Sequence, residues 1–300
     1  MPRTVAIIGA GRAGRVFARR LHELGWKIGA VVTQSEPSAR RAVRFIGAGH
    51  PSASISARVF AARTILVATP DSAIPRVAGE LARAGGAELR GKVVLHTSGA
   101  LSSHVLDSLR EHGAATGSIH VMQTFTGIGL PSMEGRVFAI EGDVRAVNTA
   151  RRMARDLGGL PVQIAGSVKS LYHCAAVLAC SQVLAVMEAA ARLLMSIGMK
   201  RREALRALLP LTRQVLQNFE RLGPTAAWTG PLAREDYGVI QAHTLALRKF
   251  PPEFSEAYGA LNRLAAGVLA PDRAAVLLEL GGAASQAGSK SMVTSTGGSL

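Results

Sequence analysis

Residues 4–25 read TVAIIGAGRAGRVFARRLHELG, and this stretch decides the fold of the N-terminal half. A short apolar run, residues 4–9, has the β-branched character of a parallel strand that is buried on both faces. Gly9, Gly11 and Gly14 then form a G-x-G-x-x-G pattern at the point where an amphipathic helical segment begins. A strand, this glycine pattern and a helix in that order are the signature of a turn that binds a dinucleotide.

Each glycine has its own physical reason in such a turn. Gly9 permits the tight turn, Gly11 lets the backbone approach a pyrophosphate, and Gly14 lets the helix pack close to the sheet. The free N–H groups of the helix start, at Arg12 and Ala13, carry a partial positive charge toward the phosphates. We therefore expect these five residues to hold a pyrophosphate; a tight turn without a ligand is the alternative.

The remaining sequence divides into an alternating half and a helical half. Further strands are expected at residues 27–33, 64–69, 92–97, 116–121, 136–141 and 161–165, with amphipathic segments between the first of them. This alternation predicts an α/β Rossmann domain with a doubly wound, mostly parallel sheet. After about residue 166 only helical patterns follow, at residues 168–197, 201–222, 233–249, 253–267 and 271–287. We predict a Rossmann domain at 1–165, an all-α domain at 166–287 and a small polar tail at 288–300.

The end of the second predicted strand indicates which dinucleotide is bound. An NAD site usually places an acidic residue there to hold the ribose hydroxyls, but this chain continues TQSEPSARR after the strand. Ser35, Arg40 and Arg41 could instead bind a 2′-phosphate, which an acidic residue would repel. The pattern favours NADP over NAD; a solvated helix face explains the two arginines as the alternative.

Two other strand ends belong to the same expected crevice. In an open α/β sheet, ligands bind beyond the carboxyl ends of the strands. Thr69 and Pro70 follow one strand and Ser98 follows the next. We expect Thr69 and Pro70 on the adenosine side of the cofactor and Ser98 on the nicotinamide side.

Three polar residues are candidates for chemistry. Lys169 and His173 are four residues apart, so they share one face of a predicted helix that is apolar further along. A lysine at this position could polarise a carbonyl oxygen while hydride arrives at the carbon. His120 lies near the end of the predicted strand 116–121, beside the same crevice. The alternatives are a snorkelling lysine and histidines that bond to the backbone.

The composition excludes several classes of protein. The formal net charge of +15 comes almost entirely from arginines scattered along the chain, with no stripe that alternates with stacking aromatic residues, so nucleic acid is not an expected partner. Cys174 and Cys180 are six apart, which is wrong for a shared metal, and we interpret them as small core residues in a reducing compartment. The apolar run from Cys174 to Met187 is the nearest approach to a membrane span but is interrupted. We expect a cytoplasmic protein without a metal site.

With these motifs in place, the chain resembles the Rossmann-like proteins joined to a helical C-terminal domain of unknown function. These belong to the 6-phosphogluconate dehydrogenase-like, ketopantoate reductase-like and pyrroline-carboxylate reductase-like superfamily. The resemblance covers nearly the whole chain and is carried by AIIGAGRAG, ILVATPDSAI, VLHTSGAL, GSIHVMQTF, SLYHCAAVLAC and TGPLAREDYGVIQAH. It implies a C-terminal domain of the 6-phosphogluconate dehydrogenase type, a nicotinamide cofactor and a homodimer formed through the helical domain.

Two local resemblances bear on the candidate chemistry. HVMQTF is similar to the His-Pro-Met segment of prephenate dehydrogenases, in which the histidine bonds the reacting hydroxyl; here Val121 replaces the proline. GSVKSLYH is similar to the helix start of β-hydroxyacid dehydrogenases and ketopantoate reductases. Lys169 matches their catalytic lysine, and His173 stands where they have an asparagine.

The sequence therefore predicts an NADP-dependent oxidoreductase. We expect it to reduce a carbonyl or imine, or to oxidise the corresponding hydroxyl or amine, of a small anionic metabolite. The main alternative is a non-enzymatic NADP-binding sensor or scaffold protein, which would have the same fold and glycine turn. The two differ in whether Lys169 and His120 come together at the nicotinamide end of the cofactor.

Overall fold

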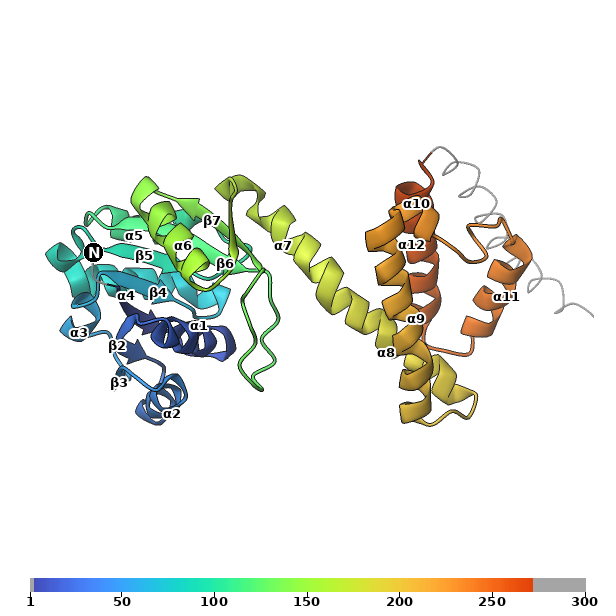
Figure 1. The fold of residues 1–300 in the computed structure, drawn as a ribbon, viewed down its shortest axis with the longest axis horizontal. Helices are drawn as coiled ribbons and strands as arrows, with labels where there is room; N and C mark the ends of the chain where they lie inside the picture. The colour runs from blue at the N-terminus through green and yellow to red at the C-terminus, as the bar shows by residue number, and fades with distance from the viewer. Residues whose placement is uncertain (1–2, 272–300) are drawn as a thin grey trace, which may run out of the picture. The chain divides into compact units, whose positions relative to one another are not determined.

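The computed structural model describes residues 3–271 of a chain that divides into two compact units, Met1–Cys180 and Ser181–Leu300 (Figure 1). The first unit contains a sheet covered by helices on both faces. It extends beyond the predicted boundary at residue 165 and includes the first turns of the helix that follows. All the candidate residues from the sequence thus lie within the first unit.

An eight-stranded sheet organises this unit. Its strands lie in the order β3-β2-β1-β4-β5-β6-β7-β8, and every neighbouring pair is parallel except β6 and β7. This arrangement confirms the predicted doubly wound, mostly parallel sheet. Within the described residues, the strand that the sequence did not predict is β3, a short edge strand that tolerates Pro51 because one side of an edge strand is unpaired. The strands are β1 Thr4–Ile8, β2 Lys27–Val32, β3 His50–Ser52, β4 Thr64–Val67, β5 Val93–His96, β6 Ala115–Val121, β7 Val137–Gly142 and β8 Leu160–Gln163.

Side chains alternate along each strand, so the sheet contributes to two separate cores. On β1, Val5 and Ile7 belong to one core, whereas Ala6 and Ile8 belong to the other. The first core is closed by α1 Arg12–Glu23, α2 Glu36–Ile46 and α6 Val144–Asp156. The second is closed by α3 Ala57–Phe60, α4 Ile74–Gly85 and α5 Asp107–Arg110, with the short turns η2 Gly86–Leu89 and η3 Ser103–Leu106. The turn η1 Asp71–Ala73 precedes α4 and has no buried residue.

The connection between β6 and β7, residues 122–136, packs against α1. The guanidinium of Arg15 donates to the carbonyl of Gly127 at 2.6 Å, and that of Arg20 donates to the carbonyl of Leu130 at 2.7 Å. Met133 reaches the core beside α1. The first helix thereby links the glycine turn to the connection that follows His120.

The helices after β8 agree with the predicted ones at most positions. They are η4 Gly166–Val168, α7 Lys169–Val177, η5 Leu178–Gln182, α8 Val183–Ser196, α9 Arg201–Leu222, α10 Pro224–Ala227, α11 Tyr237–Leu247 and α12 Pro252–Leu269. The short α10 lies where no helix was predicted, since Pro224 can begin a helix without losing a hydrogen bond. The predicted helix 271–287 lies outside the described residues except for its first residue, Pro271, and the predicted tail 288–300 lies outside them entirely.

The helix Gly166–Ser196 is continuous and apolar, with a mean hydropathy of 1.8 over its most apolar 18 residues, of which 6% are buried. It is long and apolar enough to cross a membrane, a test that core helices of soluble proteins also pass. The sequence predicts instead that no apolar segment is long enough to span a membrane. The difference arises because the few polar residues that interrupt the run lower the mean hydropathy of the helix only slightly. Cys174 and Cys180 are exposed on it, so the prediction that they are core residues is wrong.

Phe138 tests the core that supports the site. Its side chain is fully buried on β7 and packs edge-to-face on Phe17 of α1, with ring centroids 6.0 Å apart. Phe138→Ala should lower the free energy of unfolding of the first unit by about 3–5 kcal/mol, because it removes a large apolar side chain and leaves a cavity. Chemical denaturation followed by circular dichroism measures this loss. Phe138→Leu is the control and should cost less than half as much; equal losses for the two variants would contradict the packing argument.

Candidate functional site

The glycine turn has the geometry that its sequence predicts. Gly9 has a φ of +87°, and a Cβ there would lie 2.7 Å from the backbone of Ala68. A Cβ on Gly14 would lie 2.2 Å from the carbonyl oxygen of Gly9, so α1 can approach the turn only with glycine at this position. Gly11 is different, because a Cβ there would meet no described heavy atom within 4 Å. The turn thus leaves open space at the one glycine that a pyrophosphate must approach.

The surroundings of the turn also fit a dinucleotide. The first turn of α1, with Arg12 and Ala13 at its start, contains no acidic residue that would oppose a phosphate. Thr69 lies against Gly9, and its buried hydroxyl has no hydrogen-bond partner among the described residues. Pro70 continues the chain from Thr69 into η1 with extended backbone. An unpaired hydroxyl beside an open turn is suited to a polar group of a ligand.

The predicted 2′-phosphate residues differ in what they contact. Arg41 donates to the hydroxyl of Ser38 at 2.8 Å, and the hydroxyl of Ser35 donates to that of Ser38 at 3.0 Å. Arg40 instead pairs with Glu36, four residues earlier, at 3.2 Å on the exposed face of α2. The structure therefore groups Ser35, Ser38 and Arg41 beyond the end of β2, whereas Arg40 has the ion pair of a solvated helix face.

Lys169 is buried rather than open to a crevice. Its side chain is 1% exposed, and its ammonium donates to the carbonyl of Ser98 at 2.8 Å and to the hydroxyl of Ser118 at 2.6 Å. The carboxylate of Glu141 lies 3.8 Å from the ammonium. In this arrangement the lysine connects the start of α7 to the turn after β5 and to strands β6 and β7.

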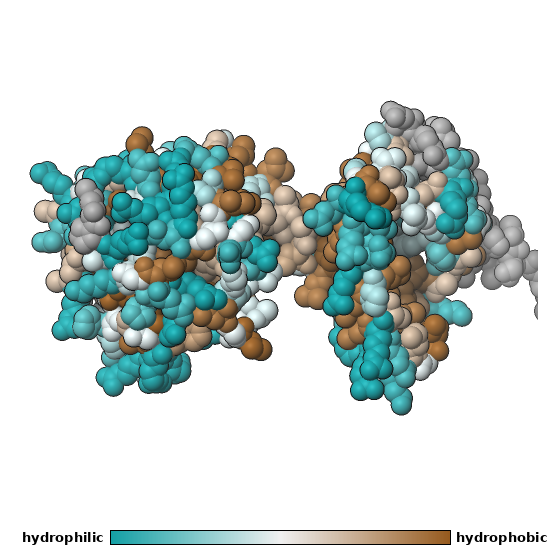
Figure 2. Space-filling view, viewed as in Figure 1, coloured by the Kyte–Doolittle hydropathy of each residue, from teal (hydrophilic) through white to brown (hydrophobic). Residues whose placement is uncertain are grey.

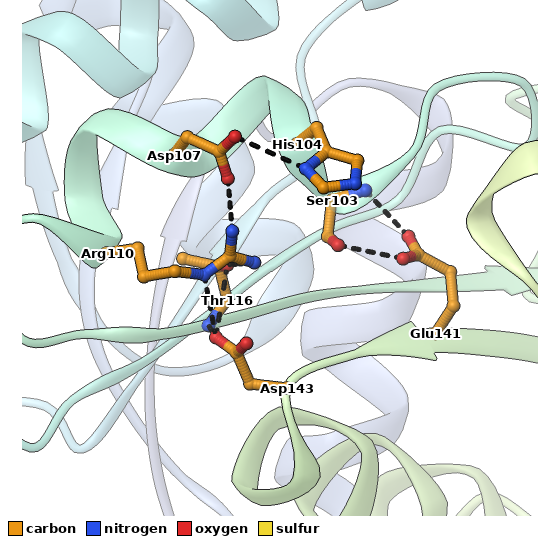
Figure 3. A network of polar contacts seen from close by, with 7 residues as sticks. All are labelled: Ser103, His104, Asp107, Arg110, Thr116, Glu141 and Asp143. Atoms are coloured by element: carbon orange, nitrogen blue, oxygen red, sulfur yellow. Dashed lines mark hydrogen bonds and ion pairs between the residues drawn. The ribbon is translucent and has the colours of Figure 1, made fainter.

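Glu141 is the centre of the same network. One carboxylate oxygen accepts the backbone N–H of Ser103 at 2.8 Å and the hydroxyl of Ser118 at 2.7 Å, and the other accepts the hydroxyl of Ser103 at 2.8 Å. Figure 3 shows the carboxylate facing Ser103, close to a second cluster in which Arg110 and Thr116 donate to Asp143. Because both oxygens of Glu141 are occupied, its buried charge is well compensated.

The charge of Lys169 reflects this environment. Burial lowers the pKa of Lys169 to about 8, while the carboxylates of Glu141 and Asp71 act in the opposite direction. At pH 7 the lysine therefore remains a cation, but its proton is held less firmly than in water. Its positive charge acts on the neighbouring histidines, His96 and His120.

Three aromatic side chains form a cluster beside this network. Nδ1 of His120 lies 2.9 Å from the hydroxyl of Tyr172, and the His120 ring meets the rings of Tyr172 and His173 edge-to-face, with centroids 5.5 and 5.8 Å apart. The cluster lies against Gly99, where a Cβ would be 2.5 Å from the His173 ring and 2.9 Å from Nε2 of His120. A glycine at 99 is required for these two histidines to occupy their positions.

The titration of this cluster keeps His120 and Tyr172 neutral at physiological pH. Burial lowers the pKa of His120 to about 4, with the charges of His173 and Lys169 acting in the same direction. Burial raises the pKa of Tyr172 to about 12. In the resting state the pair is therefore a neutral imidazole hydrogen-bonded to a neutral phenol, and neither ring carries a buried charge. Both groups can still exchange a proton with a substrate or with each other.

The turn after β5 supports the cluster. The hydroxyl of Ser98 donates to Asp71 at 2.7 Å and accepts the backbone N–H groups of Ala100 and Leu101. Its own N–H donates to Nδ1 of buried His96, whose pKa is lowered to about 3 by burial and by the charge of Lys169. Ser98 is thus occupied inside the protein, and its side chain orients the turn that carries Gly99.

The structure brings the three candidates for chemistry together. Lys169, His120 and His173 meet around the turn after β5, and the glycine turn, Thr69 and Ser98 lie at the carboxyl edge of the same sheet. Within residues 3–271, no group of three or more metal-ligating side chains is arranged around a common point.

Some residues of this site were not recognised from the sequence. Tyr172, Gly99, Ser118 and Glu141 are not among the residues that the sequence predicts. One signal for Glu141 was available, because it is a carboxylate in an otherwise apolar strand, and a buried carboxylate needs hydrogen-bond donors. Gly99, Ser118 and Tyr172 carry no comparable local signal.

Comparison with protein families identifies both parts of the chain. Residues 2–121 match the model of a Rossmann-like domain, and residues 136–265 match a domain of unknown function, DUF2520. No curated protein matches the sequence significantly. The resemblance drawn from the sequence motifs is therefore confirmed for both parts.

Solved structures with the same fold cover nearly the whole chain. BF3122 from Bacteroides fragilis, an NADP oxidoreductase by name, has a TM-score of 0.71 at 24% identity, covering 88% of this chain and 98% of its own. Protein TM1727 from Thermotoga maritima has a TM-score of 0.63 at 24% identity, covering 93% and 98%. The reductive aminase from Aspergillus terreus, solved with NADPH and ethyl-5-oxohexanoate, has a TM-score of 0.61 at 20% identity, covering 97% and 95%. At these identities the similarity establishes the fold.

Lys169 and Glu141 provide a test of the buried network. Lys169→Met should lower the free energy of unfolding of the first unit by about 3 kcal/mol or more, because it leaves the Glu141 carboxylate buried without its cation. The double variant Lys169→Met/Glu141→Gln should recover most of that loss, since a neutral amide keeps hydrogen bonds to the serines. Denaturant unfolding at pH 7 measures both. A single variant as stable as the parent would show that the ion pair contributes little to the fold.

Proposed function

We propose that this chain, which belongs to the Rossmann-like proteins with a DUF2520 domain, is an NADP-dependent oxidoreductase that reduces a carbonyl or imine. The observation that carries the proposal is the neutral His120–Tyr172 pair, which lies against Gly99 at the carboxyl edge of a sheet whose first turn is open at Gly11. Fold neighbours include an NADPH complex of a reductive aminase and an imine reductase from Streptomyces aurantiacus, which supports this class of reaction.

The cofactor would be held by the chain's own backbone and by one guanidinium. The N–H groups at the start of α1 would bind the pyrophosphate, and Thr69 would offer it the hydroxyl that has no partner among the described residues. Arg41, oriented by its hydrogen bond to Ser38, would bind the 2′-phosphate that distinguishes NADP from NAD. When bound, NADPH supplies the hydride that adds to the substrate carbon.

His120 supplies the matching proton at the substrate heteroatom. When the Tyr172 hydroxyl donates to Nδ1, the neutral ring carries its proton on Nε2, the nitrogen that has no hydrogen-bond partner among the described residues. Nε2–H then donates to the carbonyl oxygen or imine nitrogen, where negative charge develops as hydride arrives at carbon. As the C–H bond forms, the Nε2 proton passes to that atom and the Tyr172 proton moves to Nδ1. The imidazole therefore stays neutral, and the phenolate left on Tyr172 regains its proton from solvent.

The reverse reaction uses the other tautomer of the same pair. It retraces the same transfers: with Tyr172 ionised, Nδ1–H donates to the phenolate and leaves a lone pair on Nε2. That lone pair can accept the proton of a hydroxyl or amine as hydride leaves. Lys169 acts behind the pair as a positioning residue: it fixes the turn that carries Gly99, and its charge helps to keep His120 neutral.

A homodimer in the cytoplasm is part of the same proposal. Leu171 and Leu184, on the long apolar helix, are 73% and 71% exposed within the described chain, which is unfavourable for a monomer in water. A second copy would bury this helix. Light scattering of the purified protein tests it, and a mass of one chain, or extraction only in detergent, would argue against it.

The central experiment is a titration of the protein with NADPH, followed by turnover with keto acids, neutral ketones and cyclic imines. NADPH oxidation with one of these classes supports the proposal, and a preference for keto acids supports an anionic substrate. Tight NADPH binding without turnover of any class would favour the sensor or scaffold alternative.

Arg41 and Arg40 test the choice of cofactor. Arg41→Ala should weaken NADPH binding about tenfold or more and leave NADH binding unchanged, because it removes a charge-assisted contact to the 2′-phosphate. Arg40→Ala is the matched control and should change NADPH affinity less than about threefold, since Arg40 already pairs with Glu36. Nicotinamide fluorescence measures both constants. Tighter binding of NADH than NADPH by the parent protein would contradict NADP specificity.

His120 and Tyr172 test the proton donor. His120→Asn should lower kcat about 10²-fold with NADPH affinity within about threefold, because general acid catalysis is lost while the cofactor contacts remain. Tyr172→Phe should lower kcat by a smaller factor and should change the dependence of kcat on pH, because the tautomer of His120 is no longer fixed. His173→Asn serves as the control for ring packing. Full turnover in the His120 variant would exclude it as the donor.

A further inference from the structure

The amino ends of the strands, opposite to the cofactor edge, carry a groove lined by arginines. Two adjoining hollows, of about 270 and 440 Å³, share Arg3, Asn148 and Arg152 in their walls. They lie where β4 and β5 begin and along the outer face of α6. Because the strands concerned are parallel, this groove is at the other end of the sheet from the glycine turn.

The groove is strongly basic. Among the described residues that form its walls, Asp156 is the only acidic one, and six are arginines: Arg3, Arg63, Arg145, Arg151, Arg152 and Arg155. Asp156 is already engaged, since it accepts from Arg3 at 3.3 Å and from the indole of Trp26 at 3.0 Å. The hollows are comparable in size to sites that hold small molecules.

The arginines of α6 follow the helical period. Positions 145, 148, 152 and 155 lie on the outer face of the helix, whereas Ala146, Val147 and Ala150 face the core. Figure 2 shows the face that carries α6 as hydrophilic. Arg155 gains some stabilisation from the helix C-terminus, but Arg145 and Arg152 lie too far from that end to do so.

Some of the helix arginines elsewhere in the described chain have acidic partners. Arg19 pairs with Glu23, Arg76 with Glu80 and Arg192 with Glu188, each four residues away. Arg152, by contrast, has no hydrogen-bond or ion-pair partner among the described residues, although it lines both hollows. Several guanidinium groups with a single acidic residue among them repel one another. A bound anion with several negative charges would reduce this repulsion.

We propose that this groove binds a small molecule that carries two or more phosphate groups. Guanidinium groups match phosphate oxygens in a bidentate manner, and several forks along two joined hollows suit a chain of phosphates better than a single anion. The buried indole of Trp26 offers no exposed ring, so this residue does not provide the stacking surface that a nucleic acid strand uses. The site is independent of the proposed oxidoreductase activity.

Isothermal titration with inorganic tripolyphosphate tests the proposal on the full-length protein. The parent should bind tripolyphosphate at least about tenfold more tightly than orthophosphate, which engages fewer guanidinium groups. Arg152→Gln/Arg155→Gln should weaken tripolyphosphate binding at least about tenfold, since each charge-assisted contact contributes substantially. Glutamine preserves helix propensity on this exposed face, so the variant should fold as the parent does.

Arg83→Gln on α4 is the matched control, because Arg83 is an exposed helix arginine on the other face of the sheet. It should leave tripolyphosphate affinity within about twofold, and the double variant should leave NADPH affinity unchanged. The proposal is overturned by any of three results: no tripolyphosphate binding at millimolar concentration, equal weakening by Arg83→Gln, or binding that is lost in Arg41→Ala and retained in the double variant. Tighter binding of single-stranded DNA at the same groove would identify a nucleic acid as the ligand and would also overturn it.

Discussion

The first unit depends on the burial of a single ammonium group. Lys169 has lost its contact with water, and removing a cation from water is unfavourable unless hydrogen bonds and an opposite charge replace the hydration. The replacements come from three different segments: the carbonyl of Ser98, the hydroxyl of Ser118 and the carboxylate of Glu141. The turn after β5, the strands β6 and β7 and the start of α7 are therefore held in one arrangement, because losing any of them would leave a buried charge uncompensated.

This arrangement explains how acid–base groups can be placed with precision. Gly99 follows directly from Ser98, and Tyr172 and His173 follow Lys169 by about one helical turn, so the network that binds the ammonium also sets the distance between Gly99 and the three rings. The same positive charge disfavours protonation of His120. The two groups therefore have different roles: the Lys169 cation orients the turn after β5, and the neutral imidazole of His120 exchanges a proton.

Local patterns in the sequence were sufficient for much of the fold. The glycine turn and the strands were predictable because turn geometry and the apolar character of a buried strand depend on neighbouring residues. The burial of Lys169 was not, since its partner Ser118 is 51 residues away in the chain. Arg40 and Arg41 are adjacent in the sequence but have different partners in the folded helix. Arg40 pairs with Glu36, whereas Arg41 donates to Ser38. The prediction of buried cysteines is wrong because it assumes that an apolar helix is a buried helix, whereas Cys174 and Cys180 are exposed.

The sheet places two chemically different surfaces at its opposite ends. At the carboxyl edge, the charges of Lys169 and Glu141 are buried and mutually compensated, which leaves neutral rings beside the turn after β5. At the amino edge, arginines accumulate around Asp156. The helix α6 connects the two ends, because its outer face carries Arg152 while its inner face packs on β6 and β7, the strands that present Ser118 and Glu141. The same helix thus forms a wall of the groove and packs on the strands of the buried network, while none of the described groove residues takes part in that network.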